Sequence, residues 1–248
     1  MLERLFSNRP CFCGSGKPFR ACHASVFDRM RAMRRNGYPM PSRSLLKTRE
    51  QLAGIRASAR INTLVLDTVA GEVAEGMPLS RIDEIVYDTT LASGARPAPL
   101  NYEGYPYSVC VSVNDQVCHG FPKKDVRLKS GDIVNVDCST EFQGYFSDAS
   151  RMFEIGDVDE RCHLLVTGTH ACLEAALAKV EPWKPIGVMS AAIQACAHGA
   201  GFSVVTDYGG HGCGLRFHEA PFIDYGFKRT EGMVMVPGMP FPSEPMIK

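Results

Sequence analysis

The sequence has no excess charge of either sign, no long apolar run and a single tryptophan. Its 27 lysines and arginines balance 27 aspartates and glutamates, so no net field draws the protein toward nucleic acid or an anionic membrane. No run approaches the roughly 20 apolar residues that a membrane-spanning helix needs, and the N-terminus lacks the apolar core of a secretory signal. We therefore expect a cytoplasmic protein, monomeric and without membrane contact.

The ten cysteines, in a chain without an export signal, favour reduced thiols and metal binding over a disulfide framework. Cys11, Cys13, Cys22 and His23 lie together in the segment RPCFCGSGKPFRACH. Three thiolates and one imidazole are a closed ligand set for structural zinc. The segment resembles the SEC-C motif, which implies a small zinc module over residues 1–25. The alternative is that these are four unrelated reduced side chains.

The remainder of the chain divides into a short linker and one large domain. Residues 26–48 are basic and end in the breaker-rich GYPMPSRS, which indicates a linker. Residues 49–248 follow the pattern of a single mixed domain. Helical spacing of apolar residues recurs in three stretches: residues 49–76, 159–180 and 187–200.

The secondary structure of this domain is predicted to repeat. Ser80 is expected to cap a second helix, and the β-rich runs YSVCVSVN, DIVNVDCS and GYFSDASRMF follow it. A further strand is expected at residues 202–205. A helix pair with hairpins, followed by a second helix pair with hairpins, predicts an α+β fold built from two similar halves.

Two acidic residues lie on a predicted β-hairpin. Asp137 ends an alternating run, a turn follows near Glu141–Gly144, and the second strand brings Asp148 back. Two carboxylates on paired strands can face each other and share metal ions. An aspartate near a strand end is more often a turn or solvated residue, so this pair alone does not decide the matter.

Two later residues complete a set of metal ligands. His211 lies between glycines, which permit close approach of the backbone, and Glu244 lies between prolines in an extended backbone. Carboxylates with one imidazole suit a divalent metal that polarises a carbonyl and activates water. The sequence therefore predicts a metal-dependent hydrolase.

Over residues 44–248 the chain resembles the type I methionine aminopeptidases of the "pita-bread" fold. The matching segments are NYEGYPYSVCVSVNDQVCHGFP, GDIVNVDCST, GYFSDASRMFEIG, GFSVVTDYGGHGCGLRFHEAP and TEGMVMVPGMPFPSEPMI. The resemblance implies an α+β fold of two pseudo-symmetric halves and removal of the initiator methionine from nascent proteins. It implies two divalent ions (Co, Mn, Fe or Zn), with Asp137 on one, Asp148 bridging both, and His211 and Glu244 on the other.

The resemblance also implies roles toward the substrate. His119 matches a histidine that contacts the scissile amide, His218 one that steadies the tetrahedral intermediate, and Glu244 is the candidate to take a proton from water. Four residues match the walls of the methionine pocket: Tyr102, Tyr105, Cys110 and Phe217. An aromatic and sulfur-lined pocket suits a thioether, although Cys110 and Phe217 also fit a plain core role.

Two departures from the family are visible. Glu103 stands where the family usually has histidine, which places an acid at the pocket rim. The chain stops at Lys248, four residues past Glu244, whereas the family supplies a bridging glutamate and a pocket tryptophan further on; Trp183 does not match that position. We therefore expect a fold without the C-terminal strands and a weak second metal.

Other interpretations stay open. Without its fifth ligand the protein could be a non-catalytic or weakly active pita-bread module that binds peptides, although survival of the other ligands argues against this. An Xaa-Pro peptidase would share the metal ligands but not the NYEGYPYSVC segment. Lys17, Arg20 and the run RMRAMRR are basic enough to contact ribosomal RNA, but such a run is more often a solvated helix face.

Overall fold

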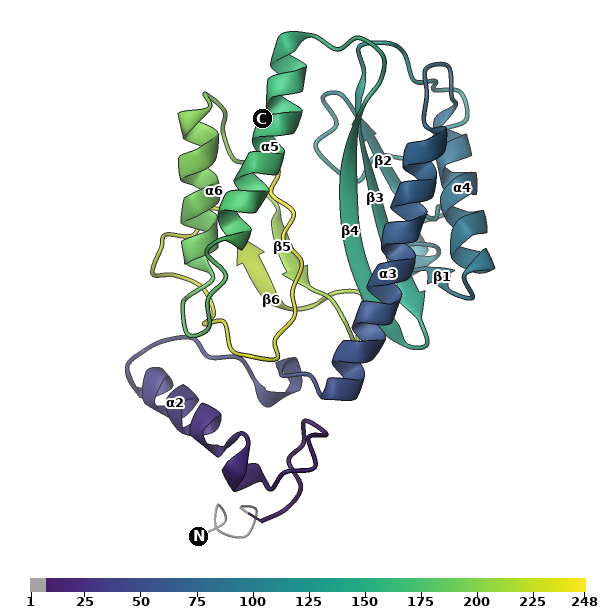
Figure 1. Cartoon of the computed structure of the whole chain (residues 1–248). Coiled ribbons are helices and arrows are strands. Elements are labelled where there is room, and N and C mark those ends of the chain that lie inside the picture. Colours follow the sequence, from purple (N-terminus) through teal and green to yellow (C-terminus); the bar gives the residue numbers. More distant parts are fainter. Residues whose placement is uncertain (1–7) are drawn as a thin grey trace.

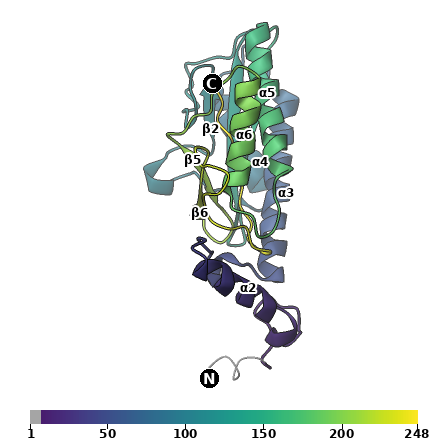
Figure 2. The ribbon, with the colours of Figure 1, turned by 90° about the vertical axis from the view of Figure 1, so that its left-hand side faces the viewer.

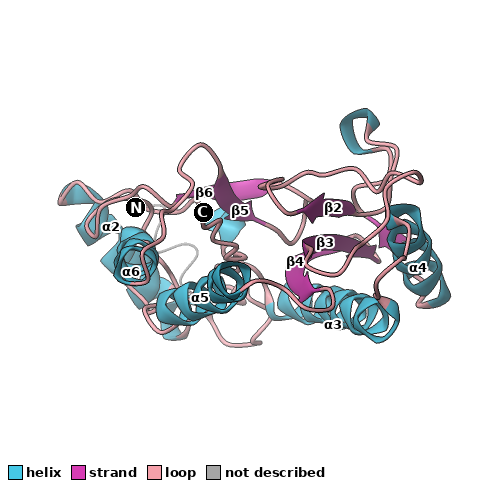
Figure 3. Ribbon diagram, turned by 90° about the horizontal axis from the view of Figure 1, so that it is seen from above, coloured by secondary structure: helices cyan, strands magenta, loops and turns pink. Residues whose placement is uncertain are grey.

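The structure, a computed structural model, describes residues 8–248. Its elements form two halves that lie side by side (Figure 1). Seen from above, the helices follow one side of the molecule and the strands lie along the other (Figure 3). No helix among the described residues is both long and apolar enough to cross a membrane.

The first half is a four-stranded sheet covered by a helix pair. It comprises α3 (Arg49–Glu72), α4 (Leu79–Ala92), β1 (Arg96–Pro97), β2 (Cys110–Val113), β3 (Ile133–Phe142) and β4 (Tyr145–Glu154), with the short turn η3 (Tyr102–Gly104). All pairings are antiparallel: β3 pairs with β4 along one edge and with β1 and β2 along the other. Apolar residues of α3, α4 and the sheet form one core.

The second half has its own helix pair and a small sheet. It comprises α5 (Glu160–Leu177), α6 (Gly187–Gly199), β5 (Gly209–Gly212) and β6 (Glu219–Asp224). β5 and β6 pair antiparallel, with a bulge between His211 and Gly212. A second core joins α5 and α6 to β6 and to the loops that follow it. The expected arrangement of two helix pairs, each with its own strands, is present.

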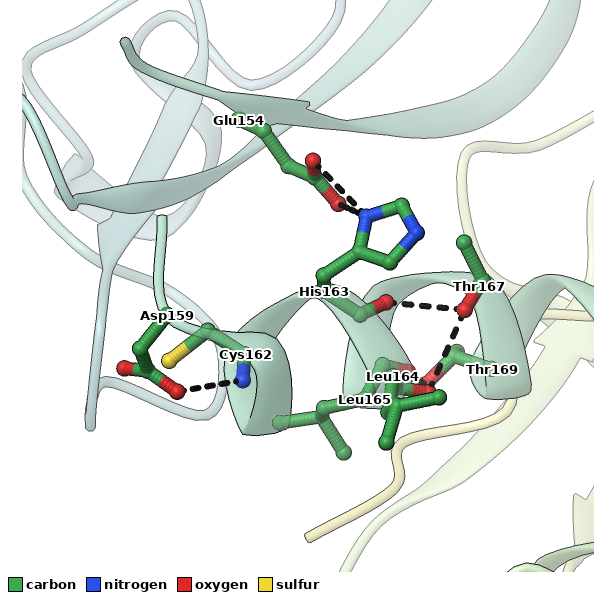
Figure 4. A network of polar contacts seen from close by, with 8 residues as sticks. All are labelled: Glu154, Asp159, Cys162, His163, Leu164, Leu165, Thr167 and Thr169. Carbon is green, nitrogen blue, oxygen red and sulfur yellow. Dashed lines mark hydrogen bonds and ion pairs between the residues drawn. The ribbon is translucent and has the colours of Figure 1, made fainter. Parts of the chain in front are cut away.

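Local sequence explains how the helices begin. Thr48 and Gln51 form a reciprocal capping box at the start of α3. At α5, the Asp159 carboxylate accepts a hydrogen bond from the Cys162 N–H at 3.0 Å, and His163 lies 3.0 Å from Glu154 at the end of β4 (Figure 4). These contacts hold the connection between the two halves.

The β3–β4 hairpin agrees with its prediction and refines it. Its turn is formed by Gln143 (φ 54°) and Gly144 (φ 81°), both in the left-handed region that a tight hairpin turn requires. Asp137 and Asp148 lie on the paired strands but not directly opposite each other, since Asp137 faces Ser150 and Asp148 faces Ser139. The two acids are therefore diagonal neighbours on the ladder.

Three local predictions are wrong. The N-cap of α4 is Pro78, without a side-chain cap, rather than Ser80. Residues 202–205 do not form a regular strand: Val204 makes an isolated bridge with Ile247, flanked by backbone hydrogen bonds between Ser203 and Lys248 and between Val205 and Met246.

The third concerns residues 26–48, which are packed structure rather than a linker. They contain most of α2 (Ala24–Arg35) and the turn η2 (Arg43–Leu45), and Met30, Met40 and Leu46 are buried in the core of the second half. The Arg29 guanidinium also lies 4.3 Å from the Trp183 ring centroid. The division of the chain at residues 25 and 48 stays a prediction.

The N-terminal loop carries its own turn η1 (Phe19–Ala21) and lies at one end of the molecule (Figure 2). The Arg49 N–H donates to the Cys13 carbonyl at 2.9 Å, and the Arg43 guanidinium lies 4.2 Å from the Phe12 ring centroid. The loop is thus attached to the start of α3 and to the segment that precedes it.

Candidate metal centre and peptide site

A cavity of about 1600 Å³ lies where the two halves meet. Its walls come from the sheet of the first half, from α5, from β5 and from the C-terminal segment. All ten residues that the sequence and the resemblance single out for the hydrolytic site line it: Tyr102, Tyr105, Cys110, His119, Asp137, Asp148, His211, Phe217, His218 and Glu244.

Three of these residues bring ligand atoms together. Asp148, His211 and Glu244 place one donor atom each within 4.8 Å of the others. His211 Nε2 lies 3.3 Å from Asp148 Oδ2 and 3.8 Å from Glu244 Oε1. Ser139 donates a hydrogen bond to the other Asp148 oxygen at 2.7 Å, which leaves Oδ2 directed toward the group. Two carboxylates and one imidazole are a donor set that fits a divalent cation.

The backbone around His211 sets the orientation of its ring. Nδ1 lies 2.9 Å from the Gly212 carbonyl, which can only accept, so Nδ1 carries a proton and Nε2 is the ring atom directed at the carboxylates. A Cβ at Gly212 would lie 2.2 Å from the Ala220 carbonyl oxygen, so only glycine fits there. Burial lowers the pKa of His211, but the contacts with Asp148, Gly212 and Glu244 outweigh it, and the net shift is upward.

Acidic groups are crowded and partly desolvated at this point. Burial and the charge of Asp148 raise the pKa of Glu244 to about 7. Asp137 keeps some exposed surface, but its Oδ1 is buried and has no hydrogen-bond partner among the described residues. Burial and the charges of Asp148 and Glu244 raise the pKa of Asp137 well above its usual value. A cation among these carboxylates would reduce their mutual repulsion, and one within reach of Asp137 would give its unpaired oxygen a partner.

Two further histidines line the cavity. His218 Nδ1 lies 3.1 Å from the Tyr102 hydroxyl, and its ring centroid is 4.3 Å from that of His211. Burial and the neighbouring His211 lower the pKa of His218, which favours a neutral ring. His119 adopts a φ of 55°, and its ring meets Tyr208 edge-on at 5.8 Å.

The predicted methionine pocket is apolar and neutral. Tyr102 and Phe217 pack edge to face with centroids 4.9 Å apart. The Tyr105 hydroxyl donates to the Val109 carbonyl at 2.9 Å, and burial raises the pKa of Cys110 to about 11. The thiol is therefore uncharged at neutral pH and offers a soft surface suited to a thioether. Glu103, at the rim, has a φ of 47° and is exposed.

The N-terminal cysteines form a second ligand group. Cys11, Cys13, Cys22 and His23 each place a donor atom within 4.8 Å of the others. Cys11 Sγ lies 3.1 Å from His23 Nδ1, and Cys13 Sγ lies 3.6 Å from Cys22 Sγ. Contacts with Ser15 and the other thiols lower the pKa of Cys13 to about 7, against the effect of burial. This geometry fits one tetrahedral ion.

Some residues that support the site were not predicted from the sequence. Ser139 lies two residues after Asp137, so strand alternation places both on one face and indicates it in retrospect. The Tyr225 hydroxyl accepts a hydrogen bond from the Glu244 N–H at 2.8 Å, and no local pattern points to it. Asn62 on α3 donates to the Cys138 carbonyl and accepts from Thr140, at 2.8 and 2.7 Å.

Comparison with known proteins shows which family this architecture matches. Residues 53–248 match metallopeptidase family M24 and residues 8–25 match the SEC-C motif. The methionine aminopeptidase of Chlamydia trachomatis is 35% identical over 97% of this chain and 83% of its own length. Methionine aminopeptidase A of Synechocystis is 39% identical over 82% of this chain and 80% of its own length.

Solved structures agree. The Rickettsia prowazekii methionine aminopeptidase superposes with a TM-score of 0.79 at 35% identity, covering 82% of this chain and 81% of that one. The Thermotoga maritima enzyme gives 0.80 at 34% identity with the same coverage. The Pyrococcus furiosus prolidase, at 21% identity and a TM-score of 0.62, shares the fold. The predicted pita-bread fold is confirmed, and the chain belongs to metallopeptidase family M24, within its methionine aminopeptidases, with an N-terminal SEC-C motif.

Proposed function

We propose that this chain hydrolyses the peptide bond after an N-terminal methionine, and that its substrates are newly made proteins that still carry the initiator residue. The observation that carries the proposal is the convergence of Asp148, His211 and Glu244 beside His218 at an apolar, aromatic pocket. A non-catalytic peptide-binding role is less well supported, because a binding module has no need of crowded, desolvated carboxylates.

We propose that Asp148, His211 and Glu244 hold one divalent ion, and that Asp137 with Asp148 holds a second one more weakly. Cobalt, manganese, iron and zinc are the candidates. Asp137 stands outside the compact three-residue group but carries a buried oxygen without a partner, which supports the second position. When bound, such an ion polarises the scissile carbonyl and lowers the pKa of water.

The chain's own residues supply the proton transfers and the orientation. Glu244, whose carboxylate faces His211 in the ligand group, is the candidate to take a proton from the attacking water and to return it to the leaving amine. His218 is kept neutral and is oriented by the Tyr102 hydroxyl, so it can hydrogen-bond the oxygen on which charge develops. His119, which also lines the cavity, is the candidate to contact the scissile amide.

Specificity for methionine follows from the pocket walls. Tyr102, Tyr105, Cys110 and Phe217 present rings and one neutral thiol, which favour a flexible thioether over a charged side chain. The direct test compares Met-Ala-Ser with Ala-Pro-Ser as substrates. Release of methionine from the first peptide and no cleavage of the second is expected; preferential cleavage of the proline peptide would replace the assignment with an Xaa-Pro peptidase.

We further propose that the four N-terminal ligands hold one structural zinc and that the adjoining basic surface contacts ribosomal RNA in the cytoplasm. Lys17, Arg20, Arg34 and Arg35 are exposed around this loop and helix, so they are available to phosphates. Sedimentation with ribosomes should be lost at high salt and in an Arg34→Glu/Arg35→Glu variant. Equal sedimentation of wild type and variant would exclude this contact. We expect the protein to act as a monomer.

A further inference from the structure

A buried ion pair adjoins the site without including any of its proposed ligands or pocket residues. Lys47 Nζ is 2.6 Å from Glu219 Oε1, and the two side chains are only 1% and 11% exposed. Glu219 Oε1 accepts no aligned hydrogen bond from any described residue, so the ammonium group is what compensates its burial. A pair of this kind is costly to desolvate, and removing one partner leaves the other as an uncompensated buried charge.

Glu219 lies in the β5–β6 hairpin, next to the residues that carry both histidines of the site. It follows His218 directly and is the ladder partner of Gly212, which follows His211. The two strands approach so closely here that a Cβ on Gly212 would lie 2.8 Å from the Glu219 carbonyl oxygen. Fixing the Glu219 side chain therefore fixes the backbone from which both histidines project.

Lys47 also contacts the segment that carries the third ligand. Its backbone N–H donates to the Gly238 carbonyl at 2.8 Å, in the loop that leads to Glu244. Gly238 has a φ of 92°, a conformation that suits glycine. A single residue just before α3 thus contacts the hairpin of His211 and His218 through its side chain and the Glu244 segment through its backbone.

We propose that Lys47 is a positioning residue for the hydrolytic reaction and that it acts through Glu219 to set the position of the His218 ring. The Lys47 side chain is buried away from the cavity that holds the proposed ligands. This inference rests on the proposed function only for its kinetic effect, because the position of the His218 ring exists whether or not the chain is an active peptidase.

Four variants test the proposal kinetically. Lys47→Met and Glu219→Gln each leave one buried group uncompensated, so each should lower kcat for a methionyl peptide roughly 10- to 100-fold, with KM changed far less. Lys47→Arg should recover part of the loss. The double variant Lys47→Met/Glu219→Gln should lose less than the product of the two single losses, since no buried charge is then left alone.

The matched control is Arg81→Met, which removes an exposed cation that pairs with Glu72 and Glu84 on the outer helices. It should leave kcat and KM unchanged. If folded Lys47→Met and Glu219→Gln proteins both kept the wild-type kcat and only melted at lower temperature, Lys47 would be a purely structural residue. Should Lys47→Met fail to fold, Glu219→Gln, which keeps the size and polarity of the side chain, decides the question alone.

A spectroscopic measurement separates this inference from the activity itself. The imidazole resonances of His218, assigned by their absence in His218→Gln, should shift in Glu219→Gln and stay in place in Arg81→Met. If the wild-type chain were inactive but the His218 signal shifted in Glu219→Gln, the proposed function would be rejected and the positioning role would stand. An unshifted signal in folded Glu219→Gln would overturn the positioning role, whatever the activity.

Discussion

His211 Nε2 lies 3.3 Å from Asp148 Oδ2, although one residue belongs to β5 of the second half and the other to β4 of the first. The contact therefore joins the two halves at their junction. Each residue has a separate support: Ser139 holds the far oxygen of Asp148, and the Gly212 carbonyl holds Nδ1 of His211. The facing atoms are thus free to share a cation, which is the basis of the first prediction.

Removal of either ligand should abolish tight binding of a divalent ion. Asp148→Asn or His211→Ala is expected to weaken binding of Mn or Co by about 100-fold or more, because each leaves only two of the three grouped donors. Isothermal titration calorimetry on protein stripped of metal measures this. Asp88→Asn, an exposed acid on α4, is the control and should bind like wild type. Wild-type affinity in both ligand variants would exclude this metal centre.

The metal-free protein should lose stability as pH rises from about 4.5 to 7. Glu244 has a pKa of about 7 in the folded protein against 4.5 ordinarily, so over this window the folded state holds a proton that the unfolded state has released. The free energy of unfolding therefore falls with pH, by about 3 kcal/mol for this group at full effect.

Urea denaturation at about pH 5 and pH 7.5, with chelator present, measures that slope. Glu244→Gln cannot titrate and should show a clearly shallower dependence under the same conditions, while Asp137 adds a slope of the same sign in both proteins. Identical pH dependence in wild type and Glu244→Gln would show that this carboxylate is not desolvated.

We expect Asn62 on α3 to contribute to the free energy of unfolding through its buried hydrogen bonds as well as through packing. Its amide satisfies the Cys138 carbonyl and the Thr140 hydroxyl in the buried layer beneath the ligand hairpin. Asn62→Ala leaves these groups without partners and should lower the free energy of unfolding by about 2–4 kcal/mol. Thr63→Ala, whose exposed hydroxyl bonds only the Ala59 carbonyl, is the matched control. Equal melting temperatures of the two variants would contradict this account of the network.

Zinc bound at the N-terminal loop should be countable separately from the hydrolytic metal. Elemental analysis should find one zinc fewer per chain in Cys22→Ser than in wild type, since a tetrahedral site does not tolerate loss of a thiolate. Cys196→Ser, a change on α6 far along the chain from the loop, should keep the full zinc content. Equal zinc content in all three proteins would show that the N-terminal loop does not bind zinc.

Much of the fold could be predicted because its signals are local. Alternation of apolar residues and the turn ending in Gly144 predict the β3–β4 hairpin, and helical spacing predicts α3, α5 and α6. The burial of Met30 and Met40 could not be predicted in the same way. Their apolar partners come from the second half, far along the chain, so a basic segment rich in breakers gave only the appearance of a linker.

The same distinction between local signals and distant contacts applies to the residues of the site. Ligands were indicated by residue type and immediate neighbours, as with His211 among glycines and Glu244 between prolines. Supporting residues were not, because their role depends on a distant contact. Lys47 and Glu219 are residue types usually found at the surface, and only the folded chain brings them together in a buried ion pair.

The central claim is tested most directly by the release of methionine from Met-Ala-Ser by the 248-residue chain, with added Mn or Co and with Asp148→Ala as the control. The account predicts release that requires both the ion and Asp148. Absence of release by folded, metal-loaded wild-type protein, or equal release by Asp148→Ala, would contradict it.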